Sequence, residues 1–210
     1  MIMAEKYVIT LGRECGAGAT YIAQHLSKEL GIPYYDKDIF RMVSDKSGVL
    51  EEFFHVNNER PGNNLLYKLV KDLKPADQKP SLGKDIVSPD NLFRFQSELI
   101  RELADNESCI IIGRCADYVL KDHDNCVHVF VCGDMDSKVQ RMMRSYSMDE
   151  DAAIERIKET DKTRKKYYSY YTGGDWEAAS NYDLCLNTGD MSIEDAAEQI
   201  IFYLKQKKYI

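Results

Sequence analysis

The sequence predicts an α/β fold in which helices cover both faces of a parallel β-sheet. Short β-branched runs alternate along the chain with longer segments whose apolar residues recur at the spacing of one helix face. Several strand-like runs are apolar throughout, which is typical of strands that are buried on both sides. A glycine-rich turn joins the first strand-like run to the first helix-like run.

The strands of this sheet are expected where apolar and β-branched residues are densest. The runs "SCIIIG" and "CVHVFVC" have the length and composition of central parallel strands, and "IPYYD" indicates a shorter one. Five strands are expected, at residues 6–12, 32–36, 108–113, 126–132 and 183–188.

The helices are expected between and after these strands. The first ends at Gly31, a residue that commonly terminates helices, and the last begins at Ser192, three residues before Asp195, which is close to a capping box. The helical patterns cover residues 19–30, 91–105, 136–146, 149–172 and 192–207.

Two stretches fit this alternation poorly. Residues 45–90 are rich in Pro, Asn and Gly, so we expect an insertion with partly mobile loops. Residues 149–172 form a strongly charged helical pattern, in which the segment 156–166 carries six cationic and two anionic residues. This local excess of four positive charges contrasts with an acidic chain.

Length and composition limit the class of protein. The 210 residues suffice for one sizeable core, and a net charge of −7 argues against a surface for nucleic acid. No apolar run approaches the roughly 20 residues that a membrane-spanning helix needs. The six cysteines form no C-x-x-C pair and most lie in apolar runs, so we expect reduced thiols and a cytoplasmic protein.

The turn "GRECGAGAT" is the first candidate site. Free backbone N–H groups and the positive end of a helix meet where a strand leads through glycines into a helix, and together they bind anions. Loops of this kind usually end in G-K-[ST], where lysine reaches the outer phosphates and the hydroxyl binds Mg²⁺. Here Ala19 occupies the lysine position and Arg13 that of the first glycine. The alternative is a tight turn that binds nothing. The phosphate-binding candidates are Gly16, Ala17, Gly18, Ala19 and Thr20, and Thr20 is the metal candidate.

The chain resembles the cytidylate kinase-like family, P-loop relatives of the nucleoside monophosphate kinases that lack the usual lysine. The segments that carry the resemblance are "GRECGAGATYIAQHLSKELGIPYYDKDIF", "CIIIGRCADYVL" and "IKETDKTRKKYYSYYTGGDWEAASNYDLCLNT". The resemblance implies a single P-loop domain over residues 1–210, with three α/β/α layers and a five-stranded parallel sheet. It also implies an acceptor-binding insertion at about 37–92, a helical lid at about 145–176, and ATP with Mg²⁺ as ligands.

Four of the acceptor-binding candidates lie at or after the ends of the second and third predicted strands, and the fifth, Gln96, lies in the helical pattern 91–105. By resemblance, Arg41 holds the acceptor phosphate, and Arg114 matches the arginine of the D-G-R-D segment of cytidylate kinases. The aspartates of that segment are replaced by Ile112 and Cys115, so base or sugar recognition differs here. Arg114 also follows a strand at the edge where open α/β sheets place ligands. The full acceptor set is Asp36, Arg41, Gln96, Arg114 and Asp117.

The catalytic candidates are cations and one carboxylate that would surround the transferred phosphoryl group. Arg141 and Arg144 lie three residues apart on one helix face, and Asp161 with Arg164 partly matches the lid motif of the related kinases. Lids of this kind bring arginine to the phosphates. Arg13, a lid arginine or Lys162 would replace the missing lysine, although arginines at helical spacing are most often solvated ion-pair partners. The catalytic set is Arg13, Arg141, Arg144, Asp161 and Arg164.

Two further patterns are open to more than one interpretation. Tyr167, Tyr170 and Tyr171 have the spacing of a helix face, so packing is favoured over base stacking. Arg94 and Gln96 could contact a base edge. The histidines show no metal-site spacing.

Three functions remain open at this point. The first is ATP-dependent phosphorylation of a nucleoside monophosphate, with CMP or dCMP first. The absent lysine also allows a nucleotide-binding module that does not catalyse transfer. The altered "GRCAD" segment and the long insertion allow a kinase of another small metabolite.

Overall fold

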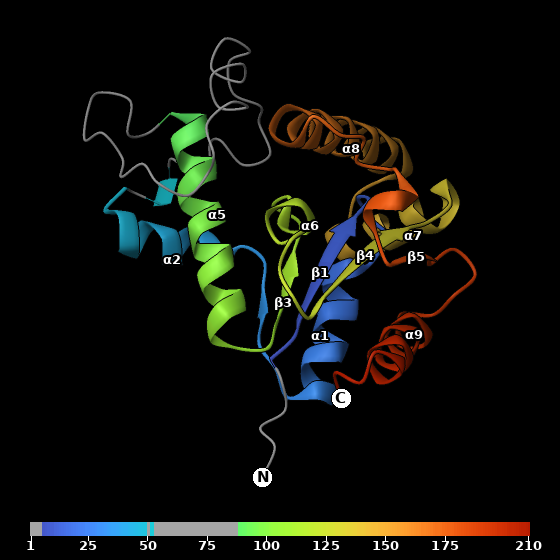
Figure 1. The fold of residues 1–210 in the computed structure, drawn as a ribbon. Helices are drawn as coiled ribbons and strands as arrows, with labels where there is room; N and C mark the ends of the chain where they lie inside the picture. Colours follow the sequence, from blue (N-terminus) through green and yellow to red (C-terminus); the bar gives the residue numbers. More distant parts are fainter. Residues whose placement is uncertain (1–5, 50, 53–87) are drawn as a thin grey trace.

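The sheet of the computed structural model, which describes residues 6–49, 51–52 and 88–210, has five strands in the order β2-β3-β1-β4-β5 (Figure 1). Every neighbouring pair is parallel, so the predicted five-stranded parallel sheet is confirmed. The strands are β1 (Val8–Arg13), β2 (Tyr34–Tyr35), β3 (Cys109–Ile112), β4 (Cys126–Cys132) and β5 (Leu184–Asn187).

The helices follow the strands along the chain, and four of them begin at a side-chain cap. The oxygen atoms of Ser88, Asp134, Asp149 and Ser192 each accept a backbone N–H three residues further on, which satisfies a donor that has no partner inside the helix. The helices are α1 (Ala19–Leu30), α2 (Asp38–Ser47), α5 (Pro89–Asn106), α6 (Ala116–Val119), α7 (Met135–Tyr146), α8 (Glu150–Thr172) and α9 (Ile193–Gln206).

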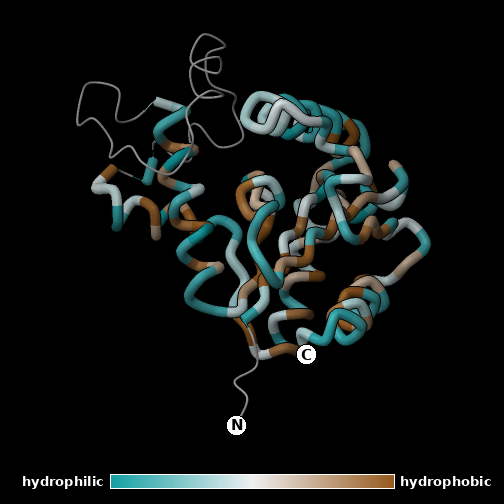
Figure 2. Tube along the Cα trace, viewed as in Figure 1, coloured by the Kyte–Doolittle hydropathy of each residue, from teal (hydrophilic) through white to brown (hydrophobic). Residues whose placement is uncertain are grey.

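Both faces of the sheet are covered, because successive residues of a strand point to opposite sides. From β1, Ile9 and Leu11 pack with α1 and α9, whereas Val8 packs with α2, α5 and α6. These side chains are fully buried, and each stabilises the fold by about 1.5–3 kcal/mol. Figure 2 shows that α1 and α9 each carry apolar stretches between hydrophilic ones, as helices with one buried face do. The predicted three layers are confirmed.

The α7–α8 pair lies at the end of the sheet toward which the arrow of β1 points (Figure 1). The first half of α8 packs on α7 and on the loop after β1, through Ala153, Ile157 and Cys15. Its second half joins a cluster in which Tyr167 and Tyr168 pack with Phe130 and Trp176. The predicted lid, residues 145–176, is thus mainly α8, and its closing motion stays a prediction.

The tyrosines of the second half of α8 pack as their helical spacing predicted. The ring of Tyr171 stacks on that of Phe93 from α5, with ring centroids 3.9 Å apart. Tyr167 and Tyr170 each meet the Tyr171 ring edge-on. Of the predicted insertion at 37–92, residue 50 and residues 53–87 lie outside the described residues, and the structure shows α2 and the start of α5.

No helix in the described part of the chain combines the length and the apolar character that crossing a bilayer requires.

Candidate functional site

The loop between β1 and α1 turns on two glycines in the left-handed region. Gly16 has φ of 80° and Gly18, the N-cap of α1, has φ of 88°, where a side chain costs about 1–2 kcal/mol. A Cβ on Gly16 would lie 2.9 Å from the carbonyl oxygen of Lys138, so α7 packs directly against the bare backbone of the loop. The glycines therefore let the main chain curl at the start of α1 with a helix close behind it.

Four backbone N–H groups of this loop have no acceptor in the described part of the protein. They belong to Gly16, Gly18, Ala19 and Thr20, whereas the N–H of Cys15 donates to Asp161 Oδ1 at 2.6 Å. The N-terminus of α1 adds its positive dipole end at the same point. This arrangement can hydrogen-bond an anion such as a phosphate group.

The carbonyl groups of the same loop are held from the opposite side. Nη1 of Arg141 donates to the Gly16 oxygen at 2.7 Å, and the hydroxyl of Thr188 lies 2.8 Å from the Ala17 oxygen. Nη2 of Arg141 also donates to the Thr188 carbonyl at 2.7 Å. Arg141 comes from α7 and Thr188 follows β5, so two distant segments hold one loop.

A cluster of charged side chains braces the loop against α7 and α8. The Nζ of Lys138 lies 2.9 Å from Glu14 Oε2 and 3.7 Å from Asp161 Oδ2, and its side chain is only 7% exposed. Glu14 also accepts the N–H of Gly133 at 3.1 Å. Burial raises the pKa of the Asp161 carboxyl, and the neighbouring Arg164 and Lys138 oppose that shift.

Arg13 extends from the end of β1 toward the ends of β2 and β3. Its Nη2 lies 4.0 Å from Asp36 Oδ1, and its guanidinium lies on the bare backbone of Gly113. Nη1 of Arg164 donates to the Arg13 carbonyl at 3.2 Å. Three predicted site residues, Arg13, Asp36 and Arg164, are therefore brought together at the end of the sheet beside the loop.

Arg114 lies in an unusual backbone segment directly after β3. Gly113, Arg114 and Cys115 all have positive φ, at 70°, 62° and 53°. The Arg114 side chain is 4% exposed, and its guanidinium carbon lies 3.9 Å from the centre of the Phe40 ring. Left-handed backbone at residues other than glycine costs about 1–2 kcal/mol each, and such strain concentrates at functional sites. Arg41 is exposed on α2, next to Phe40.

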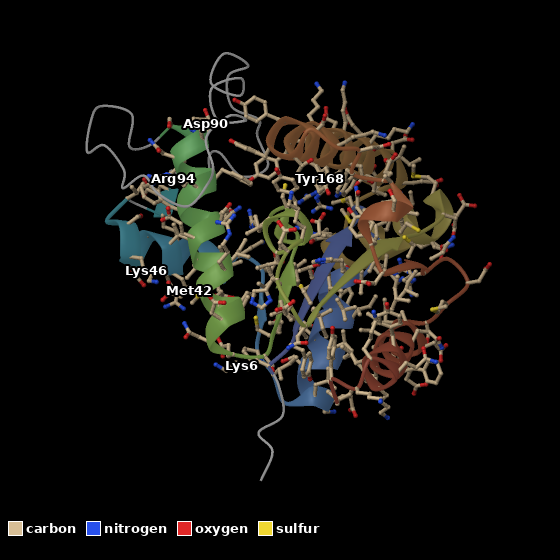
Figure 3. All side chains as sticks on the ribbon, viewed as in Figure 1. Lys6, Met42, Lys46, Asp90, Arg94 and Tyr168 are labelled. Atoms are coloured by element: carbon tan, nitrogen blue, oxygen red, sulfur yellow. The ribbon has the colours of Figure 1, made fainter. Side chains whose placement is uncertain are left out.

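Gln96 and Asp117, predicted to bind the acceptor, are buried against the tyrosines of α8. The hydroxyl of Tyr168, labelled in Figure 3, donates to Asp117 Oδ2 at 2.6 Å. The amide nitrogen of Gln96 lies 3.4 Å from the hydroxyl of Tyr167. Burial raises the pKa of Asp117, because removing the carboxylate from water outweighs the hydrogen bonds that favour its charged form. Any contact of these two residues with an acceptor stays a prediction.

The raised pKa of Asp117 has a definite consequence for stability. The folded state holds this proton more tightly than the unfolded chain, so Asp117 lowers the unfolding free energy as pH rises above about 4, the unperturbed value. Asp117→Asn removes this pH-dependent contribution to the free energy of unfolding. As the pH rises from 4 to 7, the stability of the variant is therefore expected to increase relative to that of the wild type. Urea unfolding at several pH values measures the difference. A constant difference across this range would contradict the assignment.

The remaining predicted residues lie at the surface. Arg144, Lys162 and Thr20 are exposed, and the Nε of Arg144 donates to the Gln140 carbonyl of its own helix. Arg94, labelled in Figure 3, pairs with Glu98 one turn along α5. Thr20 lies in the first turn of α1, beside the free N–H groups. The described residues contain no group of three or more His, Cys, Asp or Glu side chains that could hold a metal ion.

Three residues at the loop were not predicted from sequence. Thr188 is the last residue of the predicted strand 183–188, and its place at the carboxyl end of that strand is a signal that could have been used. Glu14 lies within the quoted loop motif. Lys138 had no such signal, because its partners lie 124 and 23 residues away in the sequence.

The fold of this chain is the one that P-loop kinases share. A shikimate kinase from Acinetobacter baumannii, solved in complex with shikimate, has the same fold, with a TM-score of 0.52, 14% identity, and coverage of 98% of this chain and 96% of that one. The family model described as "Cytidylate kinase-like family" matches residues 8–190. The chain therefore belongs to the cytidylate kinase-like family.

Individual relatives agree with this membership. A cytidylate kinase from Methanobrevibacter smithii is 24% identical over 94% of this chain and 98% of its own length. Another, from Methanopyrus kandleri, is 26% identical over 90% of this chain and 88% of its own. A solved structure of an uncharacterized protein from Eubacterium ventriosum has a TM-score of 0.70, 26% identity, and covers 95% and 99% of the two chains.

Proposed function

We propose that this protein transfers the γ-phosphoryl group of ATP to a nucleoside monophosphate, with CMP or dCMP as the first candidate. The observation that carries the proposal is the set of four free N–H groups at the start of α1, which suits the phosphates of a nucleotide. Family membership and the names of the relatives support the same reaction class. The acceptor phosphate oxygen attacks the γ-phosphorus, the bond to the β–γ bridging oxygen breaks, and ADP leaves.

The loop and the cations beside it form the donor side of the proposed site. The N–H groups of Gly16, Gly18, Ala19 and Thr20 would bind phosphate oxygens. The exposed hydroxyl of Thr20 would contact Mg²⁺ that arrives with ATP. Arg13 and Arg164 lie at the loop and would balance charge on the transferred group. Arg144 is exposed on α7, so it would contact the nucleotide from the solvent side.

The acceptor side is formed by residues after β2 and β3. Arg114 is the best-placed acceptor cation because burial and the Phe40 ring fix its guanidinium at the sheet edge. Asp36, whose Oδ1 lies 4.0 Å from Arg13 Nη2, and the exposed Arg41 of α2 would orient the acceptor. Gln96 and Asp117 would act on the acceptor indirectly, through Tyr167 and Tyr168, with which they share hydrogen bonds. The six cysteines are free thiols, which fits the proposed cytoplasmic setting.

A coupled assay of purified protein with Mg·ATP and the full panel of nucleoside monophosphates tests this function. We expect CDP or dCDP formation at about 1–100 s⁻¹, the usual range of kinases, and its loss when EDTA removes the metal. The same panel without ATP is the control. Absence of turnover with every monophosphate would remove this acceptor class.

A nucleotide-binding module without catalysis is the second candidate, and a specific observation favours it. Ala19 is 3% exposed and packs in the apolar core, so no ammonium group extends from the usual position. Calorimetry that detects tight Mg·ATP binding, together with no turnover of any acceptor, would support this function. Screening of phosphorylated and hydroxylated metabolites separates both candidates from a kinase of another small molecule.

A further inference from the structure

The guanidinium of Arg141 makes an unusual set of contacts with the phosphate loop. Nη1 donates to the Gly16 carbonyl at 2.7 Å and lies 3.3 Å from the Thr188 hydroxyl, and Nη2 donates to the Thr188 carbonyl at 2.7 Å. The Thr188 hydroxyl in turn lies 2.8 Å from the Ala17 oxygen. Three of the five N–H donors of the guanidinium are used in these contacts. Arg141 and Thr188 thus form a clasp on the carbonyl side of the loop.

The clasp determines where the loop N–H groups point. A trans peptide is planar, so its carbonyl and its N–H point in opposite directions. Holding the Ala17 oxygen toward Thr188 directs the N–H of Gly18 to the other side, where the N–H groups of Ala19 and Thr20 begin the helix. Glycine peptides are flexible, and fixing them in this way reduces the conformational entropy that the loop loses when an anion binds.

Arg141 also lies beside Gly18, the residue before the position that a phosphate-loop lysine would occupy. A Cβ on Gly18, the residue before Ala19, would lie 3.7 Å from Cδ and 3.8 Å from Nε of Arg141. The other cations at the loop are engaged by carboxylates: Lys138 by Glu14 and Asp161, and Arg13 by Asp36. Arg141 makes no ion pair among the described residues, and its hydrogen-bond partners are neutral oxygens. Its positive charge is therefore not neutralised in contact.

We propose that Arg141, seated by Thr188, takes over the task of the absent loop lysine. It is a positioning residue that holds the loop N–H groups toward the phosphates and supplies a fixed positive charge beside Gly18. The proposal rests on the proposed function, because it requires that the loop bind a nucleotide. It also gives the segment after β5 a role in phosphate binding that acts entirely through the loop backbone.

Calorimetric titration of Mg·ATP into the full-length protein tests the clasp. Arg141→Met is expected to weaken binding about 100-fold, since hydrogen bonds that involve a charged group carry the largest contributions. Arg141→Lys keeps the charge but not the two-pronged contact, so about a 10-fold loss is expected. Thr188→Val, which removes the hydroxyl at nearly constant shape, is expected to lose about 10-fold as well.

The double variant gives the decisive comparison. If Arg141 acts through the loop that Thr188 also holds, Arg141→Met with Thr188→Val binds about as weakly as Arg141→Met alone. Independent, multiplying losses would overturn the proposal, as would wild-type affinity in Arg141→Met. Arg101→Met on α5 is the matched control and keeps wild-type affinity. Thermal unfolding without nucleotide checks that each variant is folded.

The two levels of the hypothesis fail in different ways. If the wild-type protein binds no Mg·ATP, the proposed function is wrong. If the wild-type protein binds Mg·ATP and all Arg141 and Thr188 variants bind it equally well, the proposed function stands and the clasp is wrong.

Discussion

Replacing Lys138 by methionine is expected to destabilise the protein by about 3–5 kcal/mol, the usual cost of removing one partner from a buried ion pair. Methionine retains most of the apolar stem but leaves Glu14 and Asp161 facing each other, 20% and 18% exposed, without the ammonium between them. Because these carboxylates also hold the N–H groups of Cys15 and Gly133, the loop is expected to loosen with the cluster. Urea unfolding at pH 7 measures the loss.

A second substitution separates charge from packing. Lys138→Met with Asp161→Asn removes one of the two carboxylates that lose the ammonium group, and the amide oxygen can still accept the Cys15 N–H. We expect this double variant to recover part of the lost stability. The cost of Lys138→Met alone should also shrink at acid pH, because removing the ammonium raises the pKa of Asp161 further and protonation relieves the repulsion. Equal instability of both variants at every pH would show that packing, not charge, is responsible.

The sheet could be predicted because its signals are local. The runs at 108–113 and 126–132 contain β3 and β4, and the charged pattern at 149–172 matches α8 to within one residue. A buried parallel strand needs only a short β-branched run, and such a run is visible without knowledge of its neighbours. The short helices α2 and α6 were not predicted, because few helical turns give little periodicity.

The glycine-rich turn between β1 and α1 could also be located from sequence, but its environment could not. Glycine spacing indicates a turn at Gly16 and Gly18, whereas the partner of Cys15 is Asp161, 146 residues away. No local pattern distinguishes Lys138 from the other cations of the chain. Contacts of this kind are decided by how α7 and α8 pack on the end of the sheet.

The environments of the buried candidate residues could not be predicted from sequence. Asp117 and Arg114 are three residues apart, and the same role as acceptor ligands is predicted for both from sequence. In the structure Asp117 accepts a hydrogen bond from Tyr168, whereas the guanidinium of Arg114 lies over the Phe40 ring. That difference depends on the path of the backbone after β3, where three consecutive residues have left-handed φ angles. Left-handed backbone at arginine and cysteine is rare, so sequence alone gives no reason to expect it.

The second large effect is expected from Gly113→Ala, which should act on activity through Arg13. A Cβ at this position would overlap the guanidinium of Arg13, which is the mobile end of a flexible side chain and can move away without unfolding the protein. The variant should therefore fold, with Arg13 displaced from Asp36 and from the loop. If Arg13 stabilises charge on the transferred phosphoryl group, kcat for the nucleotide substrate is expected to fall by about 10²–10³-fold, the usual cost of losing one such donor.

Arg13→Met tests whether the displaced guanidinium is the cause. It should lower kcat as much as Gly113→Ala does, and the two changes together should lower it no further, because each removes the same group from the same place. The strain of a Cβ at φ of 70° is the competing explanation, since it acts even when no guanidinium is present. Adding Gly113→Ala to Arg13→Met isolates that strain in unfolding measurements and in kcat. A further large drop in kcat on this addition would assign the effect to the backbone after β3 and remove Arg13 from the mechanism.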